Sequence, residues 1–231
     1  MAIRGIVFDF DGIIVDTEGP EFSSWVNIYQ RYGADITFQE WSACLGTSQD
    51  AFDAVAELES KIGRRFSDPN LIWREQKELS IALAVQQPSL PGVMEVLERA
   101  DHLTIRLAIA SSSDRNWVIC HLDRLHLTNR FQGIFTRDEI TPVKPDPGLY
   151  LAAIQHLGLQ PEETIAFEDS PNGIRAAKAA GMICVAIPNH LSGLLDLSQA
   201  DFSLSSLSNQ PLDEILDRAN QILSKNHRDG A

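Results

Sequence analysis

Short runs of apolar and β-branched residues recur along the chain, each bounded by polar or turn-forming residues. Each run is too short for an ordinary helix, and it is largely apolar. Continuous apolar runs of this kind are typical of strands that are buried on both faces of a parallel sheet. The pattern therefore predicts strands over residues 3–8, 103–110, 133–135, 164–167 and 183–187.

Between these runs, apolar residues recur at the three- and four-residue spacing of an amphipathic helix, as with Leu151, Ile154 and Leu157. Ser170 is placed as an N-cap, with Pro171 at the first helical position and Gly181 just after the end. Because the strands alternate with helices, we expect an α/β fold with a doubly wound, Rossmann-like parallel sheet. The helices are predicted over residues 115–127, 147–158, 171–180 and 212–223.

One long segment, residues 20–87, shows only helical signals. Thr37 and Glu40 have the spacing of a capping box, a further helical run follows Ser48, and a third opens at Asp68. This interruption of the strand–helix alternation indicates a separate, all-helical domain. The predicted domains are an α/β core over residues 1–16 and 90–231, and the helical insertion over residues 17–89.

The composition is that of an ordinary globular protein, with 231 residues, of which 44% are hydrophobic and 22% charged. The chain has 32 acidic residues against 19 Lys and Arg, a formal charge of -13. A balance this acidic disfavours nonspecific binding to nucleic acid or to anionic membranes. An anionic substrate would therefore have to be captured by a local site.

The chain shows no sign of a membrane-spanning or exported protein. No apolar run reaches the ~18 residues that a membrane span needs, and the N-terminus does not look like an export signal. The three cysteines, Cys44, Cys120 and Cys184, are far apart and lack CxxC spacing. We therefore expect reduced thiols in a cytoplasmic protein.

Acidic residues follow two of the predicted buried strands. Asp9 and Asp11 come after the first strand, and Glu168 and Asp169 end a later one. The carboxyl ends of parallel strands are where ligands bind in open α/β sheets. Close carboxylates repel unless a cation is near, and oxygen ligands suit Mg²⁺. The alternative is that these acids serve turns and helix caps, with Asp169 or Ser170 as an N-cap.

Two further features supply groups that could bind an anion. Lys144 lies between prolines, which restrict its backbone, and Ser111 and Ser112 lie between a predicted strand and a helix. Hydroxyl groups and free N–H groups at a helix start can bind a phosphate. Taken singly, the lysine could be an exposed loop residue and the serines simple helix caps.

Together, four segments in this order resemble the haloacid dehalogenase superfamily of aspartate-nucleophile phosphotransferases. The segments are DFDGIIVDTE (9–18), IASSS (109–113), KPDPGLY (144–150) and EDSPNGIRAAKAAGM (168–182). The helical insertion after the first segment resembles the small cap domain of the subfamily that includes β-phosphoglucomutase-like and phosphoglycolate phosphatase-like enzymes. The resemblance covers essentially the whole chain. It implies a Mg²⁺-dependent phosphatase that acts on a small phosphorylated metabolite.

The resemblance also assigns roles to the residues that match these segments. Asp9 would attack phosphorus and form an aspartyl-phosphate, and Asp11 would act as general acid and base. The backbone carbonyl of Asp11 would bind the metal with Asp9 and Asp169, and Glu168 would be either a further ligand or an outer-shell group. Lys144 would offset charge, and the phosphoryl oxygens would meet Lys144, Ser111 and Ser112.

Other activities stay open at this point. A sugar phosphomutase of the β-phosphoglucomutase kind is the main alternative. That subgroup has His where this chain has Glu21, and Arg after a Gly-x-Ser turn where this chain has Gln49 after Thr47 and Ser48. An amide suits a second phosphate less well than a guanidinium does, so hydrolysis is favoured.

A dehalogenase is a third possibility and a non-catalytic binding protein a fourth. Dehalogenation needs no Mg²⁺, and a degenerate binding protein would have lost Asp9, Asp11 or Lys144, all of which are present. Glu21, Thr47 and Gln49 are the substrate-facing residues expected from the cap. A monomer is expected, and a homodimer stays open.

Overall fold

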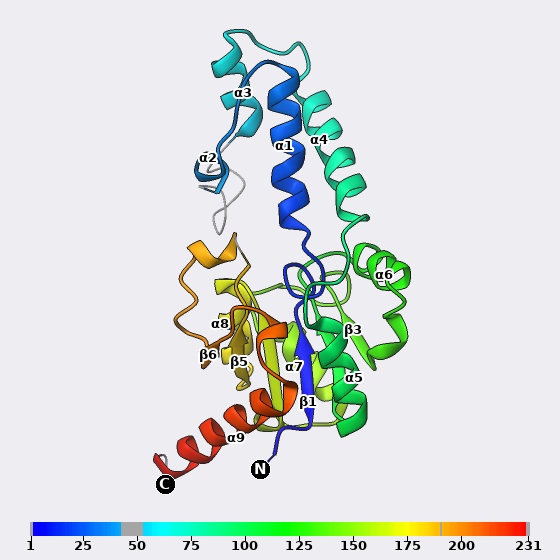
Figure 1. Cartoon of the computed structure of the whole chain (residues 1–231), viewed down its shortest axis with the longest axis vertical. Coiled ribbons are helices and arrows are strands. Elements are labelled where there is room, and N and C mark those ends of the chain that lie inside the picture. Colours follow the sequence, from blue (N-terminus) through cyan, green and yellow to red (C-terminus); the bar gives the residue numbers. More distant parts are fainter. Residues whose placement is uncertain (1, 43–52, 190, 230–231) are drawn as a thin grey trace. The chain divides into compact units, whose positions relative to one another are not determined.

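The computed structural model describes residues 2–42, 53–189 and 191–229, and the chain divides into two compact units (Figure 1). The core unit comprises Met1–Val15 and Pro88–Ala231, and the helical unit comprises Asp16–Gln87. The two units are described separately below.

The core unit is built on a six-stranded sheet in the order β3-β2-β1-β4-β5-β6, with every neighbouring pair parallel. All the predicted strands are present, and β6 was missed because it is only two residues long. The first strand lies in the middle of the sheet, between β2 and β4. The strands are β1 (Gly5–Phe8), β2 (Arg106–Ala110), β3 (Gly133–Phe135), β4 (Thr164–Glu168), β5 (Ile183–Ala186) and β6 (Phe202–Ser203).

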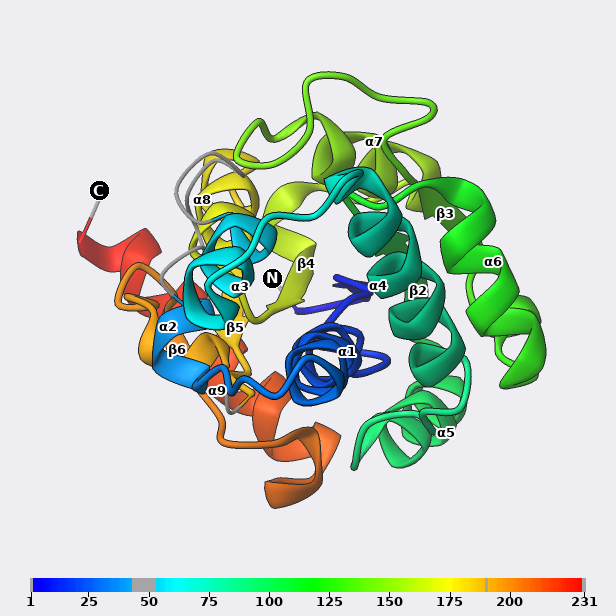
Figure 2. The same ribbon diagram turned by 90° about the horizontal axis from the view of Figure 1, so that it is seen from above.

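The two faces of the sheet differ in the size of their side chains. Bulky residues such as Phe8, Ile109 and Phe167 pack on one face with α5, α6 and α9. Small residues such as Ala108 and Ala166 lie on the other face, under α7 and α8. In the view from above, α7 and α8 lie on one side of the strands and α5 and α9 on the other (Figure 2). This is the expected doubly wound α/β architecture.

The helices of the core unit begin and end largely where the sequence indicates. The Ser170 hydroxyl accepts from the Gly173 N–H at 3.0 Å, which confirms the predicted cap of α8. Leu151, expected in the core, is 45% exposed, because α7 instead turns Tyr150 inward. The helix α5 was not predicted. The helices are α5 (Val93–Leu103), α6 (Arg115–Arg124), α7 (Gly148–Leu157), α8 (Pro171–Ala179) and α9 (Leu212–Asp229).

The helical unit contains the expected helical runs. Thr37 and Glu40 form the predicted capping box, with Glu40 accepting from the Thr37 N–H at 2.7 Å and the Glu40 N–H donating to the Thr37 hydroxyl at 3.2 Å. Asp53 caps α3, whereas Ser48 lies outside the described residues. The rings of Trp25 and Trp73 meet edge to face at 4.9 Å. The helices are α1 (Glu18–Arg31), α2 (Phe38–Ser42), α3 (Ala54–Ile62) and α4 (Pro69–Ala84).

Two expectations from composition concern the fold as a whole. Within the described ranges, every helix is too short or too polar to cross a bilayer. Cys120 and Cys184 are free thiols. Cys44 lies outside the described residues.

Candidate active site

The carboxyl ends of β1 and β4 bring three acidic side chains together. Asp9, Glu168 and Asp169 are buried, and each offers a carboxylate oxygen within 4.8 Å of the other two. The chain leaves β1 through Gly12, whose φ of +78° favours glycine. A Cβ at this position would lie 2.2 Å from Asp169 Oδ2, so glycine is also needed for the close approach of the two strand ends.

Lys144 provides positive charge inside this acid cluster (Asp9, Glu168 and Asp169). Its Nζ lies 2.7 Å from Asp9 Oδ1 and 2.6 Å from Glu168 Oε1, and the side chain is almost completely buried. Burial works to lower the pKa of Lys144, but the charges of Asp9 and Glu168 outweigh it and raise the pKa. The lysine is therefore protonated in the folded chain.

A single lysine does not balance the cluster. Burial, and then the charge of Glu168, raise the pKa of Asp9 to about 8, although Lys144 works in the opposite direction. Asp9 is thus short of positive charge even beside the lysine. A bound divalent cation would supply that charge.

Glu168 is held by donors on both of its oxygens. Lys144 Nζ and the Tyr150 hydroxyl both donate to Oε1, each at 2.6 Å. The Ser170 hydroxyl donates to Oε2 at 3.1 Å, as do the backbone N–H groups of Asp169 and Ser170 at 3.2 Å. A Cβ on Gly173 would lie 1.8 Å from Glu168 Oε1. The carboxylate of Glu168 is therefore held in place by donors of the protein itself.

Asp169 is oriented from the loop after β5. Asn189 Nδ2 donates to Asp169 Oδ2 at 3.0 Å. The Oδ1 atom of Asn189 in turn accepts from the N–H groups of Leu191 and Ser192, each at 2.8 Å. The loop thereby fixes the amide that holds this carboxylate.

Asp11 lies beside the cluster but has different partners. The Ser113 hydroxyl donates to Asp11 Oδ2 at 2.6 Å, and Trp117 Nε1 donates to Oδ1 at 3.0 Å. The buried Ser111 hydroxyl lies 3.5 Å from Oδ2. These donors are neutral, in contrast to the lysine that meets Asp9.

The donor set fits a hard divalent cation. The close oxygens belong to Asp9 and Asp169, backed by Glu168, and the cluster offers carboxylate oxygens without nitrogen or sulfur ligands. Mg²⁺ prefers oxygen donors of this kind and is usually bound through one or two carboxylates. Burial and the charge of Glu168 raise the pKa of Asp9, and a bound cation would lower it.

The structure brings most of the predicted site residues together. The hydrogen bonds, ion pairs and carboxylate cluster described above join six of them. These six are Asp9, Asp11, Ser111, Lys144, Glu168 and Asp169. Ser112 lies half-buried next to Ser111. Glu21 is an exposed residue in the first turn of α1. Thr47 and Gln49 lie outside the described residues.

Sequence reasoning missed three residues that contact the acids, Trp117, Tyr150 and Asn189, and it did not foresee the contact of Ser113 with Asp11. Tyr150 had a signal, since it ends the segment that begins at Lys144, and Ser113 belongs to the serine run. The positions of Trp117 and Asn189 depend on how α6 and the loop after β5 pack, which the sequence pattern does not show.

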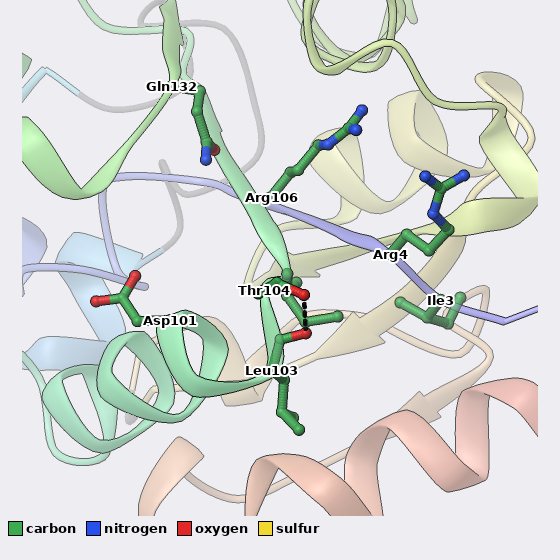
Figure 3. Close-up of a pocket in the computed structure, with 8 residues that line it drawn as sticks. Ile3, Arg4, Asp101, Leu103, Thr104, Arg106 and Gln132 are labelled. Carbon is green, nitrogen blue, oxygen red and sulfur yellow. Dashed lines mark hydrogen bonds between the residues drawn. The ribbon is translucent and has the colours of Figure 1, made fainter.

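A separate cavity of about 620 Å³ opens near the amino ends of the strands, whereas the acid cluster lies at their carboxyl ends. Arg4 precedes β1 and Arg106 begins β2, so these lining residues mark the amino ends of the strands (Figure 3). Arg4 is paired with Glu163 at 2.7 Å. The cavity is therefore distinct from the acid cluster.

Several known proteins resemble this chain over most of its length. It is 37% identical to YhcW of Bacillus subtilis (strain 168), provisionally named a phosphatase, over 94% of this chain and 98% of that protein. It is 29% identical to the phosphorylated carbohydrates phosphatase of Thermotoga maritima, over 78% and 82% of the two chains. A β-phosphoglucomutase of Bacillus subtilis (strain 168) is 27% identical, over 80% and 83%.

A solved structure shows the same family resemblance. A haloacid dehalogenase family hydrolase from Deinococcus radiodurans R1, crystallised with bound phosphate and sodium, superposes with a TM-score of 0.76 and is 25% identical, over 95% of this chain and 97% of that one. The family model for haloacid dehalogenase-like hydrolases matches residues 6–187, which include the acid cluster, Lys144 and Asp11. The chain belongs to the haloacid dehalogenase-like hydrolase family.

Proposed function

We propose that this protein is a Mg²⁺-dependent phosphatase that hydrolyses a small phosphorylated metabolite, such as a sugar phosphate, through an aspartyl-phosphate on Asp9. The observation that carries the proposal is the pairing of Asp9 with Lys144 at 2.7 Å inside a buried acid cluster, with a second carboxylate, Asp11, two residues away. The similarity to named sugar-phosphate phosphatases supports the same substrate class. We place this activity in the cytoplasm.

Asp9 is the nucleophile in this proposal. Its carboxylate oxygen attacks phosphorus while the bond from phosphorus to the leaving oxygen breaks, which produces an aspartyl-phosphate and an alcohol. A carboxylate approaching a phosphate dianion meets strong repulsion. Lys144, which already contacts Asp9, offsets part of that charge and can reach the phosphoryl group from the same position.

Asp11 is the general acid and base in this proposal. It gives a proton to the leaving alcohol in the first step, and in the second step it takes a proton from the water that attacks the phosphorus of the aspartyl-phosphate. Ser113 and Trp117 are neutral donors that hold the two oxygens of its carboxylate. This arrangement suits a group that must both hold and release a proton.

Asp9, Asp169 and the backbone carbonyl of Asp11 would hold the metal, and Glu168 would support the site from outside. Bound Mg²⁺ supplies charge neutralisation at the phosphoryl oxygens. Asn189 orients Asp169, and Tyr150 with Lys144 orients Glu168. The Ser111 hydroxyl and the Ser112 N–H would bind phosphoryl oxygens from the end of β2.

The helical unit would act as a cap that selects the substrate and excludes water. Glu21, at the exposed start of α1, would bind substrate hydroxyl groups, with Thr47 and Gln49 contributing to the same task. A carboxylate at this place suits a sugar better than a second phosphate. That difference favours a phosphatase over a mutase.

The second candidate, a sugar phosphomutase, is favoured by the similarity to a β-phosphoglucomutase. A mutase must bind a second phosphate, and this chain has Gln49 in place of the expected arginine. A dehalogenase or a non-catalytic protein fits less well, because Asp9, Asp11 and Lys144 are all in place around a cluster suited to a metal.

The test is phosphate release from a panel of sugar phosphates and other phosphomonoesters, with Mg²⁺ and with EDTA. We expect Mg²⁺-dependent release by the native chain and none by Asp9→Asn. Isomerisation of a hexose 1-phosphate without phosphate release would favour the mutase. Full release by Asp9→Asn would contradict the proposed nucleophile.

A further inference from the structure

Building on the proposed function, we propose that Trp117 is a positioning residue for the acid–base carboxylate, holding Asp11 through its indole N–H in the orientation that proton transfer requires. The contact is direct, since Trp117 Nε1 donates to Asp11 Oδ1 at 3.0 Å. The Ser113 hydroxyl holds the other oxygen at 2.6 Å. Two donors on two different oxygens fix the plane of the carboxylate, which one donor alone would leave free to rotate.

The backbone of Trp117 is fixed by the start of α6. Asp114 caps this helix, and its side chain accepts from the Trp117 N–H at 2.8 Å. The Asp114 carboxylate is in turn paired with Arg137 at 3.1 Å. The indole therefore projects from an ordered first turn rather than from a loose loop.

A buried histidine packs against the indole ring of Trp117. His121 lies one helical turn after Trp117, and the two ring centroids are 4.3 Å apart. His121 also contacts the ring of Phe10, the residue between Asp9 and Asp11, at 5.9 Å. These two edge-to-face ring contacts join α6 to the Asp9–Asp11 segment.

His121 is a neutral support. Arg124 donates to His121 Nδ1 at 3.1 Å, which leaves the proton of the neutral ring on Nε2. Burial, and then the charge of Arg124, lower the pKa of His121 to about 4. His121 Nε2 is buried without a hydrogen-bond partner among the described residues. A buried polar atom without a partner costs stability, and the edge-to-face contact of this ring with Trp117 gives the histidine a role.

The proposal predicts a defect that depends on the leaving group. Phenyl phosphate has a more basic leaving group than p-nitrophenyl phosphate, so it depends more on a proton from Asp11. The value of kcat/KM covers the steps up to release of the phenol, so it reports proton donation and is insensitive to the later hydrolysis of the aspartyl-phosphate. Trp117→Phe keeps the ring and removes only the N–H.

We expect Trp117→Phe to lower kcat/KM about tenfold for phenyl phosphate and about twofold or less for p-nitrophenyl phosphate. The same change in an Asp11→Asn background should have no further effect, since there is no acid left to position. Trp73→Phe is the matched control, because Trp73 packs against Trp25 in the helical unit and is 40% exposed. Thermal unfolding of each variant shows whether the fold is retained.

An equal loss on both esters, an unchanged kcat/KM on both, or a loss that persists in the Asp11→Asn background would overturn the positioning role of Trp117. A native chain that releases phosphate from neither ester would instead contradict the proposed phosphatase. The two failures are therefore distinguishable. The leaving-group selectivity is a readout that a merely structural role of Trp117 would not produce.

Discussion

Asp9 and Asp11 are two residues apart on one strand end, yet their surroundings differ in kind. Asp9 is buried against Lys144 and two further acids. Asp11 meets a hydroxyl and an indole N–H from α6 and its preceding loop. Lys144 works to lower the pKa of Asp9, but burial and the charge of Glu168 raise it, so the ionised form that a nucleophile needs calls for a further cation. The donors from Ser113 and Trp117 orient the Asp11 carboxylate. The difference in partners thus suggests how one short segment can supply two chemical roles.

The largest effects are expected when each of the two acids is replaced by its amide in turn, which tests whether Asp9 and Asp11 have different roles. We expect Asp9→Asn to lower kcat by at least about 10³-fold, because no nucleophile is left. Asp11→Asn should lower kcat/KM by about 10²-fold for phenyl phosphate and less for p-nitrophenyl phosphate. Steady-state kinetics with both esters measures this. Equal sensitivity of the two esters to Asp11→Asn would remove the distinction between the two acids.

Removal of Lys144 tests how much this buried cation contributes to stability and activity. Lys144→Met leaves Asp9 and Glu168 buried without their cation, so we expect the free energy of unfolding to fall by about 3–5 kcal/mol, and activity to be lost. Chemical denaturation in EDTA at pH 8 measures the change.

The matched control for this change is Lys178→Met. Lys178 pairs with Asp201 at 2.6 Å, but its side chain is 35% exposed. We expect a loss of about 1 kcal/mol or less and an unchanged kcat/KM. Equal destabilisation by the two variants would mean that burial of the Asp9–Lys144 pair has little energetic weight.

The raised pKa of Asp9 predicts a dependence of stability on pH. In the metal-free chain, folded Asp9 keeps a proton between its ordinary value of 3.8 and about 8, whereas the unfolded chain releases it. Since the native state binds more protons in this window, the contribution of Asp9 to stability falls as pH rises, by at most about 1.4 kcal/mol per pH unit.

Denaturation in EDTA at pH 5 and pH 8 measures this slope. We expect Asp9→Asn to flatten it, and saturating Mg²⁺ to restore stability at pH 8 by supplying the missing charge. Asp35→Asn, at an exposed carboxyl of the helical unit, is the control. A slope that is identical in the native chain and in Asp9→Asn would show that Asp9 is not the group responsible.

The smallest effect is expected for a substitution in the loop after β5. Asn189→Ala removes the amide that donates to Asp169 at 3.0 Å, so we expect the affinity for Mg²⁺ to fall about tenfold while the fold and kcat at saturating Mg²⁺ are largely retained. Activity titrated with Mg²⁺ measures this. Asn116→Ala, an exposed residue of α6, serves as the control. An unchanged half-saturating Mg²⁺ concentration would show that Asn189 does not support a metal ligand.

The sequence predicts the acids but not the side chains that distinguish them. Asp9, Lys144 and Asp169 follow strands or lie in a proline-rich loop, and their chemistry is visible in the residue types. Trp117 and Tyr150 come from helices α6 and α7, and their inward direction depends on which helical face packs on the sheet. Leu151 shows the same limit, since its apolar character indicates the core while the packing of α7 exposes it.

The role of Glu168 also becomes clearer only in three dimensions. Adjacent acids at a strand end look equivalent in the sequence. In the structure, Glu168 receives Lys144, Tyr150 and Ser170, whereas Asp169 meets the amide of Asn189. The two carboxylates lie in one cluster, yet their hydrogen-bond partners come from different segments, which the sequence pattern does not show.

The most direct test of the account is to trap the phosphorylated chain. The native protein is mixed with p-nitrophenyl phosphate and Mg²⁺, quenched in acid within one turnover, reduced with borohydride, and digested for mass spectrometry. We predict that the reduction marks the carboxyl group of Asp9, and that the mark is absent in Asp9→Asn and when phosphate ester is omitted. Sustained release of phosphate without a mark on Asp9, or a mark on a different carboxylate, would contradict the account.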